Sequence, residues 1–253
     1  MLKSEEEEHL RYFFSAVLFA REKLGFEPDE HQVRVLDHGI RRGLLNCTRQ
    51  WGKSTITALK AVHWAYTRAG SNVLMASASG QQAGEFLEKA CDFLADLDIR
   101  IKGDGHNRHS VRLPNGSRII AVSGRARVRG LSRIELMLID EAAEVTDHGY
   151  RTLRPMMATV KGGSIWLMST PEGKRGFFYE TWMNGGPGWT RIQVPATECS
   201  RISVEFLEEE RLAHGERWFR QEYMCEFVDL VDGLFREEDV TACISGEIPA
   251  LWD

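Results

Sequence analysis

Two short segments of this sequence contain residue types that handle phosphate groups. Residues 47–54 read CTRQWGKS and end in a glycine, a lysine and a serine. In such a loop the glycine lets backbone N–H groups face phosphate oxygens, the lysine bridges the β- and γ-phosphates, and the serine hydroxyl ligates Mg2+. The segment LMLIDE ends in Asp140 and Glu141. An aspartate at that place orders Mg2+, and the glutamate after it polarises an attacking water.

Each segment has a plainer explanation when it is taken alone. Cys47 stands where the consensus GxxxxGK[ST] has its first glycine, so GKS could be incidental to a surface turn between a strand and a helix. Asp140 and Glu141 could simply cap the helix that follows them. The two segments together indicate a nucleoside triphosphatase, and a glutamate after the aspartate favours hydrolysis over phosphate transfer to a second substrate.

The predicted ATP-binding residues form one continuous stretch. They are Cys47, Thr48, Arg49, Gln50, Trp51, Gly52, Lys53, Ser54 and Thr55. We expect Ser54 and Asp140 to hold Mg2+, and Lys53 and Glu141 to act in catalysis. The helix after Lys53 would add the positive end of its dipole. The ring of Trp51 is expected to pack against that helix rather than to stack on adenine.

The elements that must position these residues alternate between strands and helices. Compact apolar runs at 72–77, 134–145 and 164–173 predict buried parallel strands, and a short strand ends at 44–45. The remaining predictions are helices over 4–24, after Pro28, and over 53–67, 80–96, 147–158, 177–183 and 203–225, a hairpin over 111–122 and a strand over 190–196. This pattern predicts an α/β domain whose mostly parallel central sheet is covered by helices on both faces. Ligands bind such sheets beyond the carboxyl ends of the strands, where both motifs lie.

Composition restricts the function classes only broadly. The chain has 253 residues and a formal net charge of −5, so no overall positive field announces nucleic acid, although a local patch would suffice to bind it. The 5 cysteines and 8 histidines show no metal-ligand spacing, and the odd cysteine count argues against a disulfide framework. No apolar run approaches the length of about 18 residues that a membrane span needs. These features predict a cytoplasmic protein.

Several segments together resemble the large terminase subunits of tailed bacteriophages. CTRQWGKST is similar to that family's phosphate loop, in which an Arg-Gln pair is typical and the first residue is often small but not glycine. FEPDEHQ resembles the adenine-recognition segment, and NGSRIIAVS resembles the hairpin before an arginine-bearing loop. RVRGLSRIELMLIDEAAEV resembles the run into the acidic motif, and LMSTPEGKRGFFYE resembles the coupling motif. The resemblance covers roughly residues 20–240.

This resemblance implies a phosphate-loop NTPase fold of the ASCE/RecA-like type with a small C-terminal lid. It implies an ATPase that uses ATP and Mg2+ to drive double-stranded DNA into a preformed capsid. Its partners would be double-stranded DNA, a portal protein, a small terminase subunit and further copies of itself in a ring, with no membrane. The expected parts are an ATPase core over 1–200, a helical lid over 201–230, and a linker over 231–253 toward a nuclease domain absent from this chain. The expected location is the host bacterial cytoplasm.

Further residues receive roles from their chemistry or from the resemblance. A cation must stabilise charge on the transferred phosphoryl group, and Arg49 could do this in its own subunit. Arg129 matches the family's Arg-Gly pair and could reach a neighbouring subunit, although it could also belong to a solvated basic turn with Arg125, Arg127 and Arg133.

The remaining candidates lie outside the loop and the acidic pair. Gln32 would read the adenine edge or be an exposed helical glutamine. Ser169 and Thr170 would sense the γ-phosphate or end a plain strand before Pro171. Lys174 and Arg175 could meet DNA.

Two other functions stay open at this point. One is another phosphate-loop DNA translocase or helicase-like ATPase, against which the absence of a second motor domain argues. The other is a nucleotide-gated binding module that holds ATP without hydrolysing it. The second alternative predicts ATP binding without release of phosphate.

Overall fold

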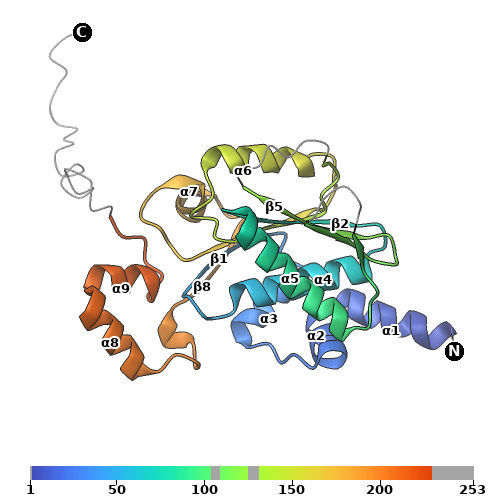
Figure 1. The fold of residues 1–253 in the computed structure, drawn as a ribbon, viewed down its shortest axis with the longest axis horizontal. Coiled ribbons are helices and arrows are strands. Elements are labelled where there is room, and N and C mark those ends of the chain that lie inside the picture. Colours follow the sequence, from blue (N-terminus) through green and yellow to red (C-terminus); the bar gives the residue numbers. More distant parts are fainter. Residues whose placement is uncertain (1, 104–108, 125–130, 230–253) are drawn as a thin grey trace, which may run out of the picture.

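The computed structural model describes residues 2–103, 109–124 and 131–229. Within those residues the strands form one sheet in the order β3-β4-β5-β2-β6-β7-β1-β8 (Figure 1). The strands are β1 (Arg42–Cys47), β2 (Asn72–Ser77), β3 (Lys102–Gly103), β4 (Ser110–Arg112), β5 (Arg118–Ser123), β6 (Leu136–Ile139), β7 (Ser164–Ser169) and β8 (Thr190–Val194). Pairing is parallel from β5 through to β8 and antiparallel along β3-β4-β5. The sheet is therefore mostly parallel, as expected.

The helices cover both faces of this sheet. They are α1 (Leu2–Phe14), α2 (Ala16–Leu24), α3 (Glu30–Leu36), α4 (Lys53–Thr67), α5 (Gly80–Asp96), α6 (Asp147–Leu153), α7 (Gly176–Asn184), α8 (Val204–His214) and α9 (Glu216–Glu222), with short 3-10 turns η1 (Arg154–Met157) and η2 (Ala196–Glu198). Helices α1 to α5 pack on one face, and α6, η1 and α7 pack on the other.

Strand residues alternate between the two apolar clusters that result. On β6, Leu136 and Leu138 point into the cluster beneath α4 and α5, whereas Met137 and Ile139 point into the cluster beneath α6 and α7. Because both faces are covered, every residue of β6 is buried and the strand reads as an uninterrupted apolar run. This arrangement explains why the central strands could be recognised from composition alone.

One close contact shapes the packing between β1 and β7. Gly43 of β1 lies beside Trp166 of β7, and a Cβ atom added at Gly43 would meet the indole ring at 2.2 Å. The missing side chain lets the fully buried indole of Trp166 lie over β1. The ammonium of Lys60 in α4 sits 4.8 Å from the centroid of that ring, a cation–π contact.

Two of the predicted helices were wrong in their continuity. The segment 4–24 is divided at Ser15, whose backbone is extended and whose hydroxyl accepts a hydrogen bond from the N–H of Leu18. A serine that caps a new helix inside an amphipathic pattern is invisible to the periodicity. The segment 203–225 is divided at Gly215, where φ is 82°. A positive φ of this kind ends a helix at little cost only at glycine.

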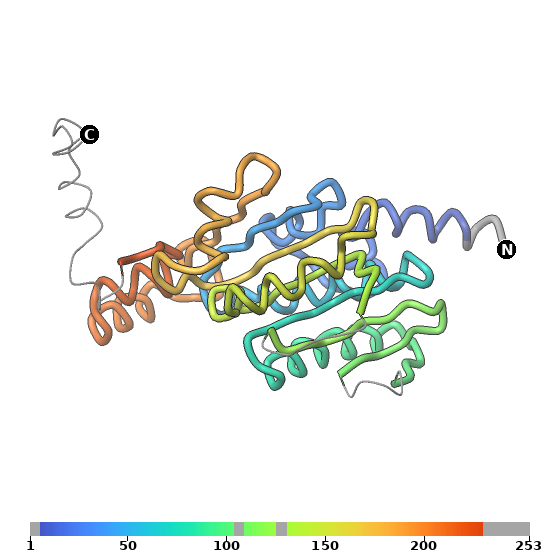
Figure 2. Tube along the Cα trace, turned by 90° about the horizontal axis from the view of Figure 1, so that it is seen from above, coloured from blue at the N-terminus to red at the C-terminus, as the bar shows by residue number. Residues whose placement is uncertain are grey.

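Helices α8 and α9 form a separate small layer at the end of the sheet where β1 and β8 finish, and Figure 2 shows the same arrangement from above. Leu207 and Tyr223 of this layer pack with Ala196, which follows β8. The predicted linker over 231–253 lies outside the described residues. Among the described helices, none is long and apolar enough to cross a bilayer.

Candidate active site

The phosphate-loop segment joins the end of β1 to the start of α4. Cys47 is the last residue of β1, and Lys53 is the first residue of α4. Between them the backbone takes positive φ at Gln50 (64°) and at Gly52 (100°), and the N–H of Thr48 donates to the carbonyl of Val194 at 3.0 Å. A glycine at Gly52 is needed because φ near 100° is costly for a residue with a side chain.

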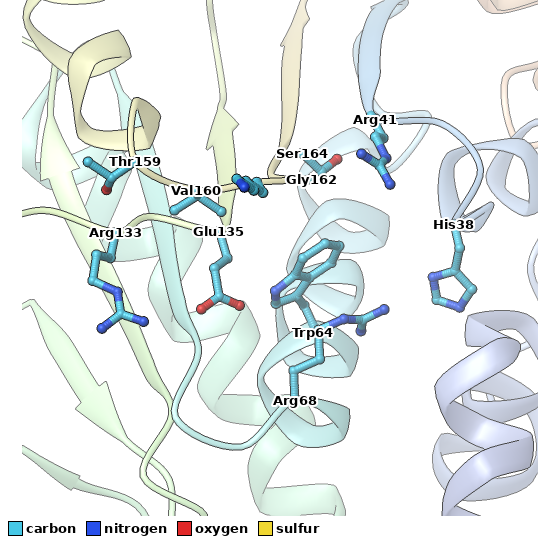
Figure 3. A pocket seen from close by; sticks show the side chains of 11 residues that line it. His38, Arg41, Trp64, Arg68, Arg133, Glu135, Thr159, Val160, Gly162 and Ser164 are labelled. Atoms are coloured by element: carbon cyan, nitrogen blue, oxygen red, sulfur yellow. The ribbon is translucent and has the colours of Figure 1, made fainter.

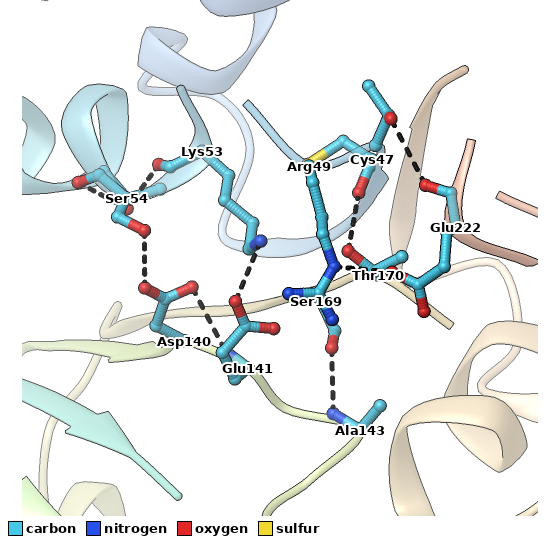
Figure 4. A network of polar contacts seen from close by, with 12 residues as sticks. Cys47, Arg49, Lys53, Ser54, Asp140, Glu141, Ala143, Ser169, Thr170 and Glu222 are labelled. Carbon is cyan, nitrogen blue, oxygen red and sulfur yellow. Dashed lines mark hydrogen bonds and ion pairs between the residues drawn. The ribbon is translucent and has the colours of Figure 1, made fainter. Parts of the chain in front are cut away.

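The loop and the acidic pair meet across an intervening strand. β7 lies between β1 and β6, so both motifs end at the same carboxyl edge of the sheet. The hydroxyl of Ser54 donates to Asp140 Oδ2 at 2.7 Å, and Nζ of Lys53 is 2.9 Å from Glu141 Oε1 (Figure 4). The structure thus brings together two pairs of neighbouring residues that are separated by 86 positions in the sequence.

Charges in this cluster are strongly coupled. Burial lowers the pKa of Lys53, but the negative groups around it, Glu141 first, outweigh burial and hold that pKa above its usual value. Burial raises the pKa of the Asp140 carboxyl, while the attraction of Lys53 and the hydrogen bond from Ser54 offset part of that rise. Opposed effects of burial and of neighbouring charges on these pKa values are typical of sites that handle charged ligands.

The backbone aims Glu141 into the cluster. Its φ is 48°, an uncommon left-handed value for a residue other than glycine, asparagine or aspartate. The turn is secured on both sides: the N–H of Glu141 donates to Asp140 Oδ1 at 3.1 Å, and the N–H of Ala142 donates to the carbonyl of Met168 at 2.9 Å. Backbone strain held by surrounding hydrogen bonds is a feature of functional sites.

The arginine of the loop is tied to the helical layer. Nε of Arg49 lies 2.5 Å from Glu222 Oε2, and Glu222 is 6% exposed at the end of α9. The hydroxyl of Thr48 donates to the carbonyl of Glu222 at 3.2 Å, and the side-chain amide of Asn46 donates to the carbonyl of Cys225 at 2.8 Å. Asn46, Thr48 and Arg49 therefore all contact the segment that includes α9 and the residues just after it.

Cys47 and the end of β7 form a second set of contacts. Burial raises the pKa of the Cys47 thiol to about 12, so the thiol stays protonated at neutral pH. The hydroxyl of Thr170 donates to the carbonyl of Cys47 at 3.3 Å, and the hydroxyl of Ser169 accepts from the N–H of Ala143 at 3.2 Å. These two side chains join the strand ends of β1, β6 and β7.

Gln32 and Trp51 lie on the other flank of the loop. Gln32 is buried and not exposed; its side chain accepts from the N–H of Asp29 at 3.0 Å in a capping box that starts α3. Its amide nitrogen is 3.6 Å from the position a Cβ would take at Gly52. The ring of Trp51 is 1% exposed and belongs to the core, and its Nε1 donates to Asp29 Oδ2 at 3.1 Å.

Other predicted residues are not brought into the cluster, or lie outside what the structure describes. Arg129, Arg125 and Arg127 lie outside the described residues. Arg133 lines a hollow at the opposite edge of the sheet. Lys174 pairs with Asp229 at 2.9 Å, and Arg175 pairs with Glu172 at 2.8 Å. Thr55 is half-buried near the start of α4.

Three contributors were missed by reasoning from the sequence. Glu222 pairs with Arg49, Asp29 receives the indole of Trp51, and Arg201 donates to the carbonyl of Trp51. The capping pattern D-x-x-Q was the available signal for Asp29. No local pattern links Glu222 or Arg201 to a loop that is more than a hundred residues away.

The oxygen atoms at Ser54 and Asp140 suit Mg2+. A hydroxyl and a carboxylate are hard oxygen ligands, and Mg2+ is usually held by one or two carboxylates together with phosphate oxygens and water. Within the described residues no group of three or more His, Cys, Asp or Glu side chains is placed to hold a metal ion without such help. The donor set therefore fits a cation that arrives with a phosphate ligand.

This sheet and loop define a phosphate-loop NTPase fold. Residues 44–242 match the family described as "Terminase large subunit, T4likevirus-type, N-terminal", and the chain belongs to that family. The large terminase subunits of Thermus phage G20c and Thermus virus P23-45 are each 22% identical to this chain, in alignments that cover 87% of this chain and 52% of theirs. The chain thus spans about half the length of these curated relatives.

Solved structures share the fold. The ATPase domain of the Thermus phage P74-26 large terminase has a TM-score of 0.70 at 22% identity, and the match covers 82% of this chain and 97% of that domain. A large terminase from another thermophilic bacteriophage, solved in complex with ATP-gamma-S, has a TM-score of 0.66 at 14% identity, with 79% of this chain and 52% of that one covered.

Proposed function

We propose that this chain is the ATP-hydrolysing motor domain of a large terminase subunit that drives double-stranded DNA into a procapsid. The observation that carries the proposal is the convergence of Lys53, Ser54, Asp140 and Glu141 at one edge of the sheet. Membership of the terminase family and the nucleotide-bound state of one structural relative support ATP as the ligand.

Binding of ATP would begin at the loop between β1 and α4. Its N–H groups and the amino end of α4 attract the phosphates. Lys53 would leave Glu141 for the β- and γ-phosphates, and Ser54 with Asp140 would hold Mg2+. The bound Mg2+ supplies neutralisation of charge that develops on the phosphates. Gln32, beside Gly52, would read the adenine edge.

Hydrolysis would then depend on Glu141. Once Lys53 turns to the phosphates, the carboxylate is free to accept a hydrogen bond from the attacking water and to orient it. The resting pair between Lys53 and Glu141 thus keeps the base occupied until a nucleotide arrives. Ser169 contacts the turn after β6 and Thr170 contacts the end of β1, and these contacts support a role in passing a change at the γ-phosphate to β7.

Two arginines are proposed to stabilise the charge of the transition state. Arg49 would act within the subunit, and release of its pair with Glu222 would couple the nucleotide to α8 and α9. Arg129 would act on the ATP of a neighbouring copy, which requires a ring. The ring, the portal protein, the small terminase subunit, the linker over 231–253 and the host cytoplasm as location are all parts of this proposal.

A phosphate-release assay separates the proposed function from its alternatives. The wild-type protein with ATP and Mg2+ should release phosphate, Lys53→Ala should not, and double-stranded DNA should raise the rate. Binding of ATP without any release would favour a nucleotide-gated binding module. Strand separation by this chain alone would favour a helicase.

Mixing of two variants tests Arg129. Arg129→Ala and Glu141→Ala should partly restore each other's turnover in assembled motors, because each defect then lies at a different interface. No restoration at any ratio would remove the role in a neighbouring subunit. Turnover that rises more steeply than protein concentration would support the ring independently.

A further inference from the structure

A polar hollow opens at the amino edge of the sheet, the opposite end from the phosphate loop. Its lining side chains are drawn in Figure 3. Its volume is about 470 Å³, within the range of small-molecule sites. It lies where β1 and β7 begin and where α4 ends, so three elements that form the phosphate-loop site at one end line this hollow at the other. The lining residues used below are His38, Arg41, Trp64, Arg68, Arg133, Glu135, Lys161 and Ser164.

Positive charge dominates this hollow although the whole chain is acidic. Its lining includes four cationic side chains, those of Arg41, Arg68, Arg133 and Lys161, and a single carboxylate, that of Glu135. Among the residues that the structure describes, the side chains of Arg41, Arg133 and Lys161 make no ion pair and no hydrogen bond. An adjoining hollow of about 520 Å³ shares Arg41 and adds further arginines, so the positive field continues along the edge. Cations gathered without partners attract a counter-ion.

Buried polar atoms without partners point to the same ligand. The hydroxyl of Ser164, a residue 2% exposed, has no hydrogen-bond partner in the described part of the chain, nor do Nε1 of Trp64 and Nε2 of His38. Native proteins rarely leave such groups unpaired unless a ligand or water completes them. All of these residues line the hollow.

The wall that holds these groups is rigid. The guanidinium of Arg68 lies 4.1 Å from the Trp64 ring centroid and 4.5 Å from that of Phe13, and it also donates to the hydroxyl of Thr67 at 2.9 Å. Burial lowers the pKa of His38 to about 4, so its ring is neutral at pH 7 and adds no charge. The excess charge therefore comes from arginine and lysine alone and does not depend on pH near neutrality.

We propose that this hollow is a second anion site, which binds a small, multiply charged phosphoryl ligand. A single carboxylate would leave most of the positive charge unmatched, whereas pyrophosphate or a nucleoside triphosphate would match it. Arginine forks are suited to phosphate oxygens, and Ser164 and Trp64 supply neutral donors at the bottom. A DNA duplex is a convex rod, so its phosphates would contact the rim without reaching Ser164.

The test follows two indole N–H resonances by nuclear magnetic resonance. In the assigned spectrum of the whole chain, Trp64 reports on the hollow and Trp51 reports on the phosphate loop. Addition of sodium pyrophosphate at pH 7 should shift the Trp64 signal in a saturable way. ATP should shift both signals. If the site at Trp64 binds pyrophosphate and ATP with equal affinity, its ligand is an inorganic phosphate. If it binds ATP more tightly, its ligand is a nucleotide.

Variants identify the groups responsible. Arg41→Gln with Lys161→Gln should raise the pyrophosphate concentration needed at Trp64 by about tenfold or more, because two charged hydrogen bonds are lost. Ser164→Ala should raise it several-fold without risk to folding, since this hydroxyl has no partner to lose. Lys89→Gln with Arg100→Gln, both exposed elsewhere, is the control with the same change in charge and should have no effect.

Other results would overturn the proposal. They are no shift of Trp64 with either small ligand, a shift unchanged in both hollow variants, or a shift produced by duplex DNA alone. Lys53→Ala separates the two sites: it should abolish the response of Trp51 to ATP and leave the response of Trp64 to pyrophosphate intact. The experiment can therefore reject the second anion site without rejecting the proposed motor function. It can equally reject the motor function without rejecting the second site.

Discussion

The two edges of the sheet differ in how their charges are satisfied. At the carboxyl edge, Lys53 pairs with Glu141 and Arg49 pairs with Glu222. At the amino edge, Arg41 and Lys161 have no partner among the described residues. A ligand at the first edge must replace contacts that the protein already makes, so binding and rearrangement are linked there. A ligand at the second edge finds charges that are already available.

The largest expected effect comes from removing the lysine of the carboxyl edge. Lys53→Ala should lower the rate constant for ATP hydrolysis by about 10²–10³-fold, because a preorganised cation is lost where charge develops. The rate constant is measured by following the release of phosphate, and Lys89→Ala, on the exposed side of α5, is the control. A variant that keeps more than a tenth of the activity would contradict the role given to the lysine.

Loss of the proposed base, Glu141, should affect turnover and ATP affinity differently. Glu141→Gln should lower turnover by about 10²-fold or more while the affinity for ATP is kept or increased, since Lys53 no longer has an internal partner that competes with phosphate. Calorimetric titration with ATP measures the affinity. If affinity fell together with turnover, the pair would have a structural role in holding the loop.

Between the two edges lies a buried lysine whose effect should depend on pH. Burial lowers the pKa of Lys60 to about 7, and its Nζ donates to the carbonyl of Val35 at 2.8 Å. The unfolded chain keeps a lysine pKa near 10.4, so it binds more protons than the folded protein between those values. The free energy of unfolding should therefore rise with pH from about 7 toward 10.

Lys60→Met removes this contribution. Between pH 7 and pH 9 the wild-type protein should gain about 2 kcal/mol of stability relative to the variant. Urea unfolding followed by circular dichroism at both pH values measures the difference. Parallel stability curves for the two proteins would mean that Lys60 keeps an ordinary pKa.

The pair that joins the loop to α9 should contribute modestly to stability. Side-chain exposure of Arg49 is 62%, so solvent screens its interaction with Glu222. A double-mutant cycle with Arg49→Ala and Glu222→Gln should give a coupling of about 0.5–1 kcal/mol. Urea unfolding of the wild-type protein, the two single variants and the double variant measures this coupling. A coupling near zero would leave α9 held by its apolar contacts alone.

The smallest expected effect completes the contrast between the edges. Arg41→Gln with Lys161→Gln should change the free energy of unfolding by less than about 0.5 kcal/mol, because neither side chain has an internal partner. Relief of repulsion between like charges would even stabilise the fold at low salt. A large loss of stability would show that these cations have a structural role, and the comparison between the edges would fail.

Local signals in the sequence explain which parts of the fold could be predicted. The helices over 53–67 and 80–96 and the strand over 72–77 were predicted with their observed bounds, because apolar runs there are bordered by glycine and by the capping serine Ser79. The phosphate loop and the acidic pair are also local patterns. Their meeting at one edge followed from the rule that parallel strands end together.

Contacts between distant segments could not be predicted in this way. Nothing near Arg49 indicates that Glu222 will lie against it, and the residues of the amino-edge hollow come from separate loops and helix ends. Arg133 illustrates the limit: the sequence groups it with Arg125 and Arg127, whereas the fold places it in the lining of the same hollow as Glu135 and Trp64. Proximity of this kind is set by topology and not by composition.

The bare backbone at Gly43 has a consequence for how the molecule tolerates change. Alanine is ordinarily the mildest replacement, yet its methyl group would occupy the space of the Trp166 ring, and a close-packed interior gives that ring room to shift only at a cost in packing. The ring would be pushed toward the ammonium of Lys60, on the helix that begins with Lys53. One added carbon atom outside the loop is thus expected to strain the packing of the helix whose first residue is Lys53.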